Sequence, residues 1–131
     1  LSSDERNFVK DFLKFFGEEI ELENEKMIDA VSAISGCGPG YFAFLTEQME
    51  KAAEKYGLSK ESAQRVAVQT FIGSAALLDH EKISPEELRA RISSKGGLTE
   101  TAVNYLKSQK FDEIFIEAID VARKRSEELN G

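Results

Sequence analysis

The sequence of 131 residues contains one cysteine, one histidine, two prolines and no tryptophan. A single cysteine, Cys37, excludes an internal disulfide framework. His80 has no second histidine or cysteine at ligand spacing, so we expect no metal site. The longest apolar run, residues 66–78, is broken by polar side chains and is shorter than the roughly 20 residues of a membrane span. With no recognisable secretory signal, we expect a cytoplasmic protein without a membrane segment.

A surplus of positive charge is also missing. The chain has 24 acidic and 17 basic residues and a net charge of -7, which argues against nucleic acid as a partner because phosphate binding needs a basic face. The length suits one compact domain. The chain begins with Leu1 rather than methionine, which fits either a piece of a longer protein or a trimmed N-terminus.

The N-terminal segment predicts a helix followed by a strand. Residues 4–16 have a broad apolar face, with Ser3 as the N-cap and Gly17 ending the helix. Residues 18–23 alternate between apolar side chains and glutamates, which is typical of a half-buried strand. This strand has no partner in the sequence. It must pair with a second copy or with a sheet outside this chain.

The remainder reads as helices. Ser59 and Ser84 are predicted N-caps, and Glu87 should close a capping box with Ser84. The run 66–78 is apolar on every side, which requires burial on every side, and so few helices can hardly surround it. We expect it to form the core of a dimer, with a monomer built around one central helix as the alternative. The helices are predicted near residues 25–34, 41–56, 59–78, 84–91, 99–109 and 111–129.

Two glycine-rich turns are candidate sites. Residues 35–40, Ser-Gly-Cys-Gly-Pro-Gly, lack the Gly-x-Gly-x-x-Gly spacing and follow a helix rather than a strand, so they do not form a dinucleotide fingerprint. They predict a helix–turn–helix joint that allows close backbone approach. This interpretation is favoured over a direct contact with a cofactor phosphate.

The second turn, within residues 91–102, is the better candidate. Gly96 and Gly97 can adopt positive φ, so the turn can gather several N–H groups around a small anion. The following helix adds unpaired amides and the positive end of its dipole. The expected guest is a carboxylate or a phosphate. The alternative is a plain connection in which Thr99 is the N-cap.

These turns resemble those of pyrroline-5-carboxylate reductases. Residues 35–41 resemble the family's Ser-Gly-Ser-Gly-Pro-Ala-Tyr, and residues 94–99, Ser-Lys-Gly-Gly-Leu-Thr, resemble its Ser-Pro-Gly-Gly-Thr-Thr. Gly57-Leu58, Gln69-Thr70 and Gly73-Ser74-Ala75 match the family's next helix pair. The resemblance extends from about residue 17 to residue 129. The departures are Cys37, Gly40, Lys95 and Leu98, whereas the second threonine is retained as Thr99.

The resemblance implies a mainly α fold, a helical-bundle dimerisation domain of the 6-phosphogluconate dehydrogenase C-terminal type, with one strand left over from a Rossmann domain. Residues 1–24 would be the end of that dinucleotide-binding domain, and residues 25–131 the helical dimerisation and substrate domain. A homodimer is implied, and some family members assemble further. NADP or NAD would bind mainly to the absent domain. The residues of this chain expected near the cofactor are Ser35, Gly36, Gly38 and Pro39.

The implied reaction is the reduction of 1-pyrroline-5-carboxylate to L-proline by NAD(P)H. The backbone amides of Ser94, Gly97 and Thr99 would hold the substrate carboxylate, in a turn that includes Gly96. The Thr99 hydroxyl would bond to the ring nitrogen as the catalytic group. Two alternatives stay open: a structural dimerisation module without a ligand site, and an imine reductase homologue with another substrate.

Overall fold

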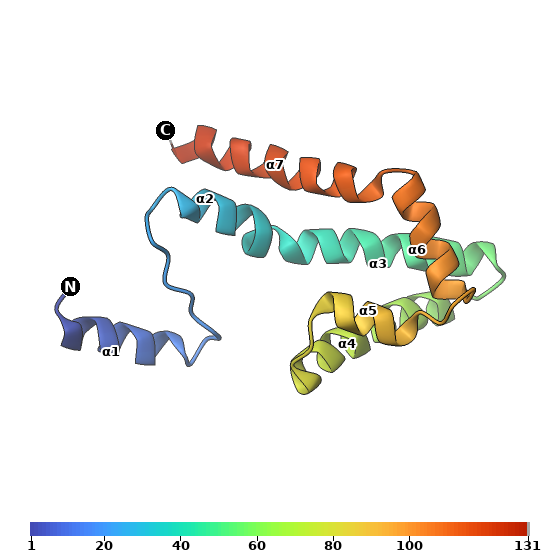
Figure 1. Cartoon of the computed structure of the whole chain (residues 1–131), viewed down its shortest axis with the longest axis horizontal. Coiled ribbons are helices and arrows are strands. Elements are labelled where there is room, and N and C mark those ends of the chain that lie inside the picture. The colour runs from blue at the N-terminus through green and yellow to red at the C-terminus, as the bar shows by residue number, and fades with distance from the viewer. Residues whose placement is uncertain (131) are drawn as a thin grey trace.

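In the computed structural model, which describes residues 1–130, every regular element is helical (Figure 1). The predicted mainly α class is therefore confirmed. The elements are α1 (Ser3–Leu13), α2 (Met27–Val31), the π-helical turn η1 (Ser32–Gly36), α3 (Gly38–Lys55), α4 (Lys60–Glu81), α5 (Pro85–Ile92), α6 (Leu98–Ser108) and α7 (Phe111–Asn130).

Helix α1 lies apart from the other helices, beyond an extended connection (Figure 1). Its N-cap is Ser2 rather than Ser3, because Ser2 and Glu5 form a capping box in which each side chain bonds the other residue's backbone amide. The helix ends at Leu13, earlier than predicted. Glu21 ties the connection back to α1 through ion pairs with Arg6 at 2.6 Å and Lys10 at 2.8 Å.

The strand predicted for residues 18–23 is wrong for this chain. Residues 18–22 run without regular structure, and Ile20 is 81% exposed. A strand forms only when its backbone N–H and C=O groups find a neighbouring strand. Residues 1–130 provide none.

The predicted helix–turn–helix joint is also wrong, because α2 continues into α3 through a single π-helical turn (Figure 1). The Cys37 amide donates to the Ser32 carbonyl oxygen at 3.0 Å, which is the i→i−5 bond of a π-turn. Helix α3 then begins at Gly38 instead of residue 41. Pro39 lies in its first turn, where its missing N–H costs no intrahelical bond.

Helices α4 and α7 pack against different parts of the long segment formed by α2, η1 and α3. Helix α4 lies against α3, with the Phe42 and Phe71 rings 5.2 Å apart. Helix α7 returns along α2 and η1, where Ser126 and Asn130 both donate to the Asp29 carboxylate, at 2.6 and 2.8 Å. The two ends of the helical unit are thus joined by side-chain hydrogen bonds.

The predicted caps of α4 and α5 are confirmed in position. Ser59 and Ser84 accept hydrogen bonds from the amides three residues later. The capping box at α5 is not closed, because the Glu87 carboxylate pairs with Arg91 at 2.7 Å.

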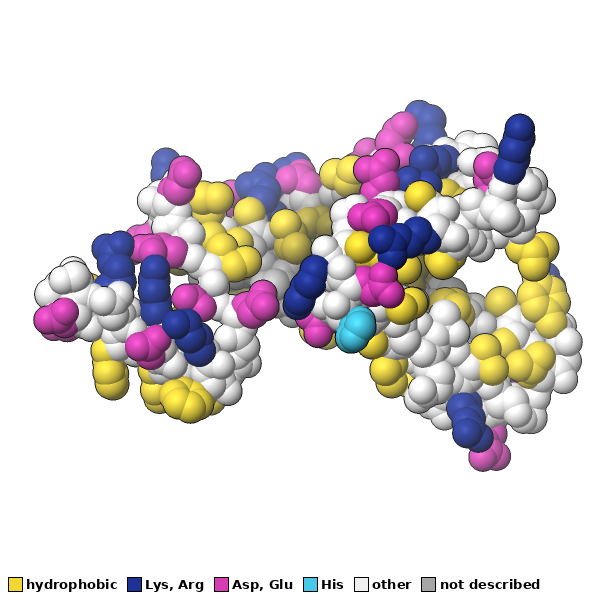
Figure 2. Space-filling model, turned by 60° about the horizontal axis from the view of Figure 1, so that its bottom comes forward, with side chains coloured by type: hydrophobic (Ala, Val, Ile, Leu, Met, Phe, Trp, Pro, Cys, Tyr) yellow, Lys and Arg dark blue, Asp and Glu magenta, His cyan; other side chains and the backbone are white. Residues whose placement is uncertain are grey.

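The chain has almost no interior of its own. Among residues 1–130, the only buried apolar side chains are those of Ala33, Ala63 and Ala67. Many other apolar side chains are exposed on the surface of several helices (Figure 2). Ile72, in the middle of the apolar run of α4, is 51% exposed. The exposed surface is 10,864 Å², whereas a folded monomer of this mass exposes roughly 6,900 Å². The alternative of a monomer built around a buried central helix is therefore wrong.

Candidate functional site

The turn between α5 and α6 is shaped by its two glycines in different ways. Gly96 has φ +70°, in the left-handed region that side chains disfavour. Gly97 has φ -79° and ψ 175°, an extended conformation, and it is the N-cap residue of α6. Positive φ was thus correctly predicted for Gly96 and wrongly for Gly97.

Gly97 is required by close packing instead. A Cβ at this position would lie 2.9 Å from the Ser94 carbonyl oxygen and even nearer to the Ser94 hydroxyl oxygen. The Gly97 amide donates to that carbonyl oxygen at 2.9 Å and closes the turn. Any ligand that uses the Gly97 amide must replace this internal bond.

The predicted substrate residues Ser94, Gly96, Gly97 and Thr99 lie together around this turn. Ser94 and Gly96 are exposed, and Thr99 is half-buried in the first turn of α6. The alternative in which Thr99 is the N-cap is wrong, since Gly97 holds that position. Because α6 begins at Leu98, the Thr99 amide has no intrahelical acceptor and points out at the positive end of the helix dipole.

A carboxylate already contacts this turn. The Gly96 amide donates to Oε2 of Glu100 at 2.6 Å, and hydrogen bonds to an ionised acceptor are shorter than those between neutral groups. The turn therefore presents an N–H group that can donate to a carboxylate oxygen.

A polar hollow of about 260 Å³ opens between α5 and α6, next to the turn. The hydroxyl oxygen of Ser93 is buried there and has no hydrogen-bond partner within residues 1–130. Sequence reasoning missed this hollow, although the i, i+4 spacings of Arg89 with Ser93 and of Glu100 with Asn104 place each pair on one helix face. The lining residues are Arg89, Ala90, Ser93, Glu100, Val103 and Asn104.

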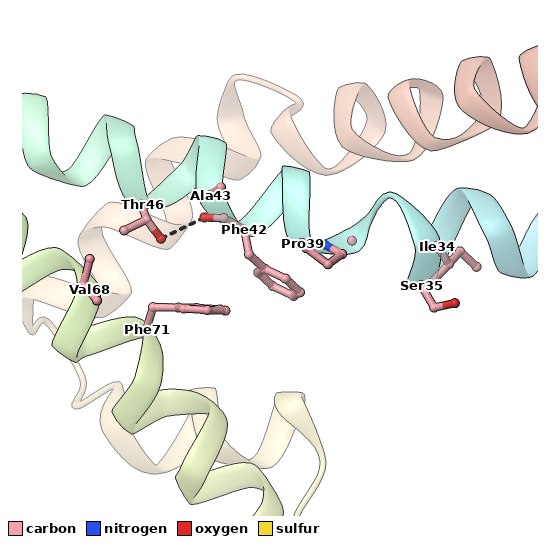
Figure 3. A pocket seen from close by; sticks show the side chains of 9 residues that line it. Ile34, Ser35, Pro39, Phe42, Ala43, Thr46, Val68 and Phe71 are labelled. Carbon is pink, nitrogen blue, oxygen red and sulfur yellow. Dashed lines mark hydrogen bonds between the residues drawn. The ribbon is translucent and has the colours of Figure 1, made fainter. Parts of the chain in front are cut away.

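The residues expected near a cofactor lie elsewhere, at the π-helical turn. Ser35, Gly38 and Pro39 line an apolar groove of about 770 Å³, together with Phe42 and Phe71 (Figure 3). Gly36 adjoins them and has open space where a Cβ would be. The two glycine segments lie well apart along the molecule (Figure 1). A single chain does not bring them into one site.

Tyr41 fastens the π-helical turn. Its hydroxyl donates to the Ala33 carbonyl oxygen at 2.9 Å, across the joint. Partial burial raises the pKa of the Tyr41 hydroxyl, and the neighbouring Cys37 thiol adds to the shift. Cys37 itself is exposed. In the part of the chain that the structure covers, no group of acidic, histidine or cysteine side chains is placed to hold a metal ion.

The helical fold and its exposed apolar faces define the class of a helical dimerisation domain. The chain belongs to the family described as pyrroline-5-carboxylate reductase dimerisation, whose model matches residues 25–129. A pyrroline-5-carboxylate reductase of Pseudomonas aeruginosa is 40% identical over 117 residues, which are 89% of this chain and 43% of that protein. Pyrroline-5-carboxylate reductase 2 of Bacillus subtilis is 41% identical over 121 residues, 92% of this chain and 43% of that protein.

Solved structures agree in fold. A pyrroline-5-carboxylate reductase from Coxiella burnetii matches with a TM-score of 0.92 and 34% identity, over 98% of this chain and 48% of that one. A pyrroline carboxylate reductase from Plasmodium falciparum, solved with NADP bound, matches with a TM-score of 0.84 and 29% identity, over 100% of this chain and 50% of that one. The chain thus spans less than half the length of the curated relatives named above. None of the helices within residues 1–130 has the length and apolar character to cross a membrane.

Proposed function

We propose that this chain is the helical part of a reductase that converts 1-pyrroline-5-carboxylate to L-proline, and that it supplies the substrate-carboxylate site. The observation that carries the proposal is the turn before α6. Its Gly96 amide binds a carboxylate oxygen at 2.6 Å, in a chain whose curated relatives carry the name of this enzyme.

The substrate carboxylate would be held by backbone N–H groups rather than by a side-chain charge. The Thr99 amide is free of intrahelical bonding, and the Ser94, Gly96 and Gly97 amides lie in the same turn. The helix dipole and the nearby Lys95 ammonium add positive potential. Fixing the anion in this way orients the small ring of the substrate.

Thr99 would then set the position of the ring nitrogen. Its hydroxyl can donate or accept a hydrogen bond, and two anchors on one five-membered ring determine which face is offered to hydride. NAD(P)H, bound mainly by a preceding dinucleotide domain, supplies that hydride to the C=N carbon. The π-helical turn with Ser35, Gly36, Gly38 and Pro39 would approach the cofactor from a second copy or after domain assembly.

The remaining surface would be covered by assembly. The chain exposes on the order of 4,000 Å² more than a compact monomer of its mass. Two copies that covered this surplus would bury about 8,000 Å² in total, which is above the roughly 5,000 Å² of large obligate homodimer interfaces. We propose a homodimer formed by residues 25–131, with residues 1–24 as the end of the cofactor domain. The single cysteine requires no oxidising compartment, and the cytoplasm is the proposed location.

One comparison of substrates tests the proposal and its alternatives. The complete enzyme should oxidise NAD(P)H with 1-pyrroline-5-carboxylate far faster than with 1-pyrroline, which lacks the carboxylate. Equal rates would support an imine reductase that does not use the turn as a carboxylate site. If the enzyme reduces neither imine but the chain forms dimers, the result would support the alternative of a structural dimerisation module.

A further inference from the structure

Glu100 lies between the turn that precedes α6 and the polar hollow between α5 and α6. Its carboxylate accepts the Gly96 N–H at 2.6 Å, in the turn proposed to hold the substrate carboxylate. The same residue also lines the polar hollow between α5 and α6. Its side chain therefore stands between the proposed substrate position and a second polar environment.

The hollow contains donors that lack partners. Arg89 is exposed and its guanidinium forms no ion pair within residues 1–130, whereas the Ser93 hydroxyl is buried without a hydrogen-bond partner there. The Asn104 amide lines the same wall. A buried hydroxyl without a partner is unfavourable, and a carboxylate turning into the hollow would accept its hydrogen bond and pair with the guanidinium.

From these contacts we infer that Glu100 is a competitor built into the carboxylate site. In the free protein its carboxylate occupies the Gly96 amide. When the substrate carboxylate takes that amide, Glu100 turns into the hollow beside Arg89 and Ser93. The inference rests on the proposed function, because it names the resting occupant of the same site.

The consequence is selectivity for anionic ligands. A site that is open for only a fraction of the time binds its ligand more weakly by that fraction. A ligand with a carboxylate displaces Glu100, whereas a neutral imine has no group that replaces its bond to Gly96. The simpler role of Glu100 is to stabilise the first turn of α6 through the helix dipole, and that role leaves ligand affinity unchanged.

The experiment is an NMR titration of the 131-residue chain with L-proline, the product that carries the same carboxylate. Glu100→Ala removes the competitor, and Glu100→Asp keeps its charge on a side chain one methylene shorter. Both variants should bind L-proline roughly 3- to 10-fold more tightly, and both should shift the Gly96 amide resonance upfield. Prolinamide, which lacks the carboxylate, should bind no variant better than the unmodified chain.

Arg89→Met tests the second position of Glu100. It should weaken L-proline binding about 3-fold in the unmodified chain, since Glu100 then has a poorer place to move to. In the Glu100→Ala background it should have no effect. An equal effect in both backgrounds would mean that Arg89 attracts the ligand directly, and would overturn the proposed movement.

The titration distinguishes a failure of the Glu100 competition from a failure of the proposed carboxylate site. Unchanged L-proline affinity in both Glu100 variants overturns the competition and leaves the proposed function in place. Tighter binding in Glu100→Ala alone shows charge repulsion and also overturns occupancy of the amide. If L-proline shifts no resonance in any variant, the proposed carboxylate site itself fails, and the competition falls with it.

Discussion

A charge in the middle of α4 should break the dimer that we propose. Ile72 is 51% exposed in the single chain and lies within the apolar run 66–78. At the core of an interface, Ile72→Glu would leave an uncompensated buried carboxylate, which costs about 3–5 kcal/mol. A two-fold dimer contains the change twice, so its dissociation constant should rise by at least about four orders of magnitude.

Sedimentation equilibrium from nanomolar to micromolar concentrations measures this shift. Ser62→Glu is the control, because it places the same charge in the first turn of α4, where the helix dipole favours it. That variant should remain dimeric. If the chain is a monomer, Ile72→Glu is a substitution at a half-exposed position and changes the free energy of unfolding by only about 0.5 kcal/mol. A dissociation constant that Ile72→Glu leaves unchanged would refute the proposed dimer core.

Three further predictions concern the site and the helical frame. Thr99→Val should lower turnover of 1-pyrroline-5-carboxylate roughly 10- to 100-fold, the worth of one hydrogen bond to a charged group, with cofactor affinity unchanged; normal turnover would remove Thr99 from the mechanism. Gly97→Ala should lower the free energy of unfolding, measured by urea denaturation, by about 1–3 kcal/mol because the new Cβ would clash with the Ser94 carbonyl oxygen. Gly36→Ala places its Cβ in open space and should leave that free energy unchanged; equal effects of the two substitutions would contradict the packing argument. Asp29→Ala should lower the free energy of unfolding by about 1 kcal/mol and speed amide hydrogen exchange at the C-terminal end of α7. Unaltered exchange there would show that the two hydrogen bonds to Asp29 do not stabilise the end of α7.

Local rules predicted much of the helical frame from the sequence. Ser59 and Ser84 are N-caps because a serine hydroxyl before a helix-forming run can accept a hydrogen bond from an otherwise unpaired amide of the first helical turn. The apolar surplus of α4 correctly indicated that a single chain could not bury it. The two glycine-rich motifs predicted the family that the comparisons then showed.

The errors arose where the structure depends on a partner or on one hydrogen bond. The alternation of residues 18–23 fits a strand, but the described residues 1–130 contain no neighbouring strand that could hydrogen-bond to it. At residues 32–37 the glycines suggested a broken helix, whereas one i→i−5 bond from Cys37 carries the helix through. The choice between Gly96 and Gly97 for positive φ depends on how the turn closes onto Ser94, which spacing alone does not encode.

Titration of this chain with L-proline, followed by NMR with prolinamide as the control, tests the central claim most directly. The account predicts saturable shifts at residues 94–99 with L-proline and none with prolinamide, because the turn holds a carboxylate. Equal shifts with both ligands, or none with either, would contradict the claim that these amides form the substrate-carboxylate site.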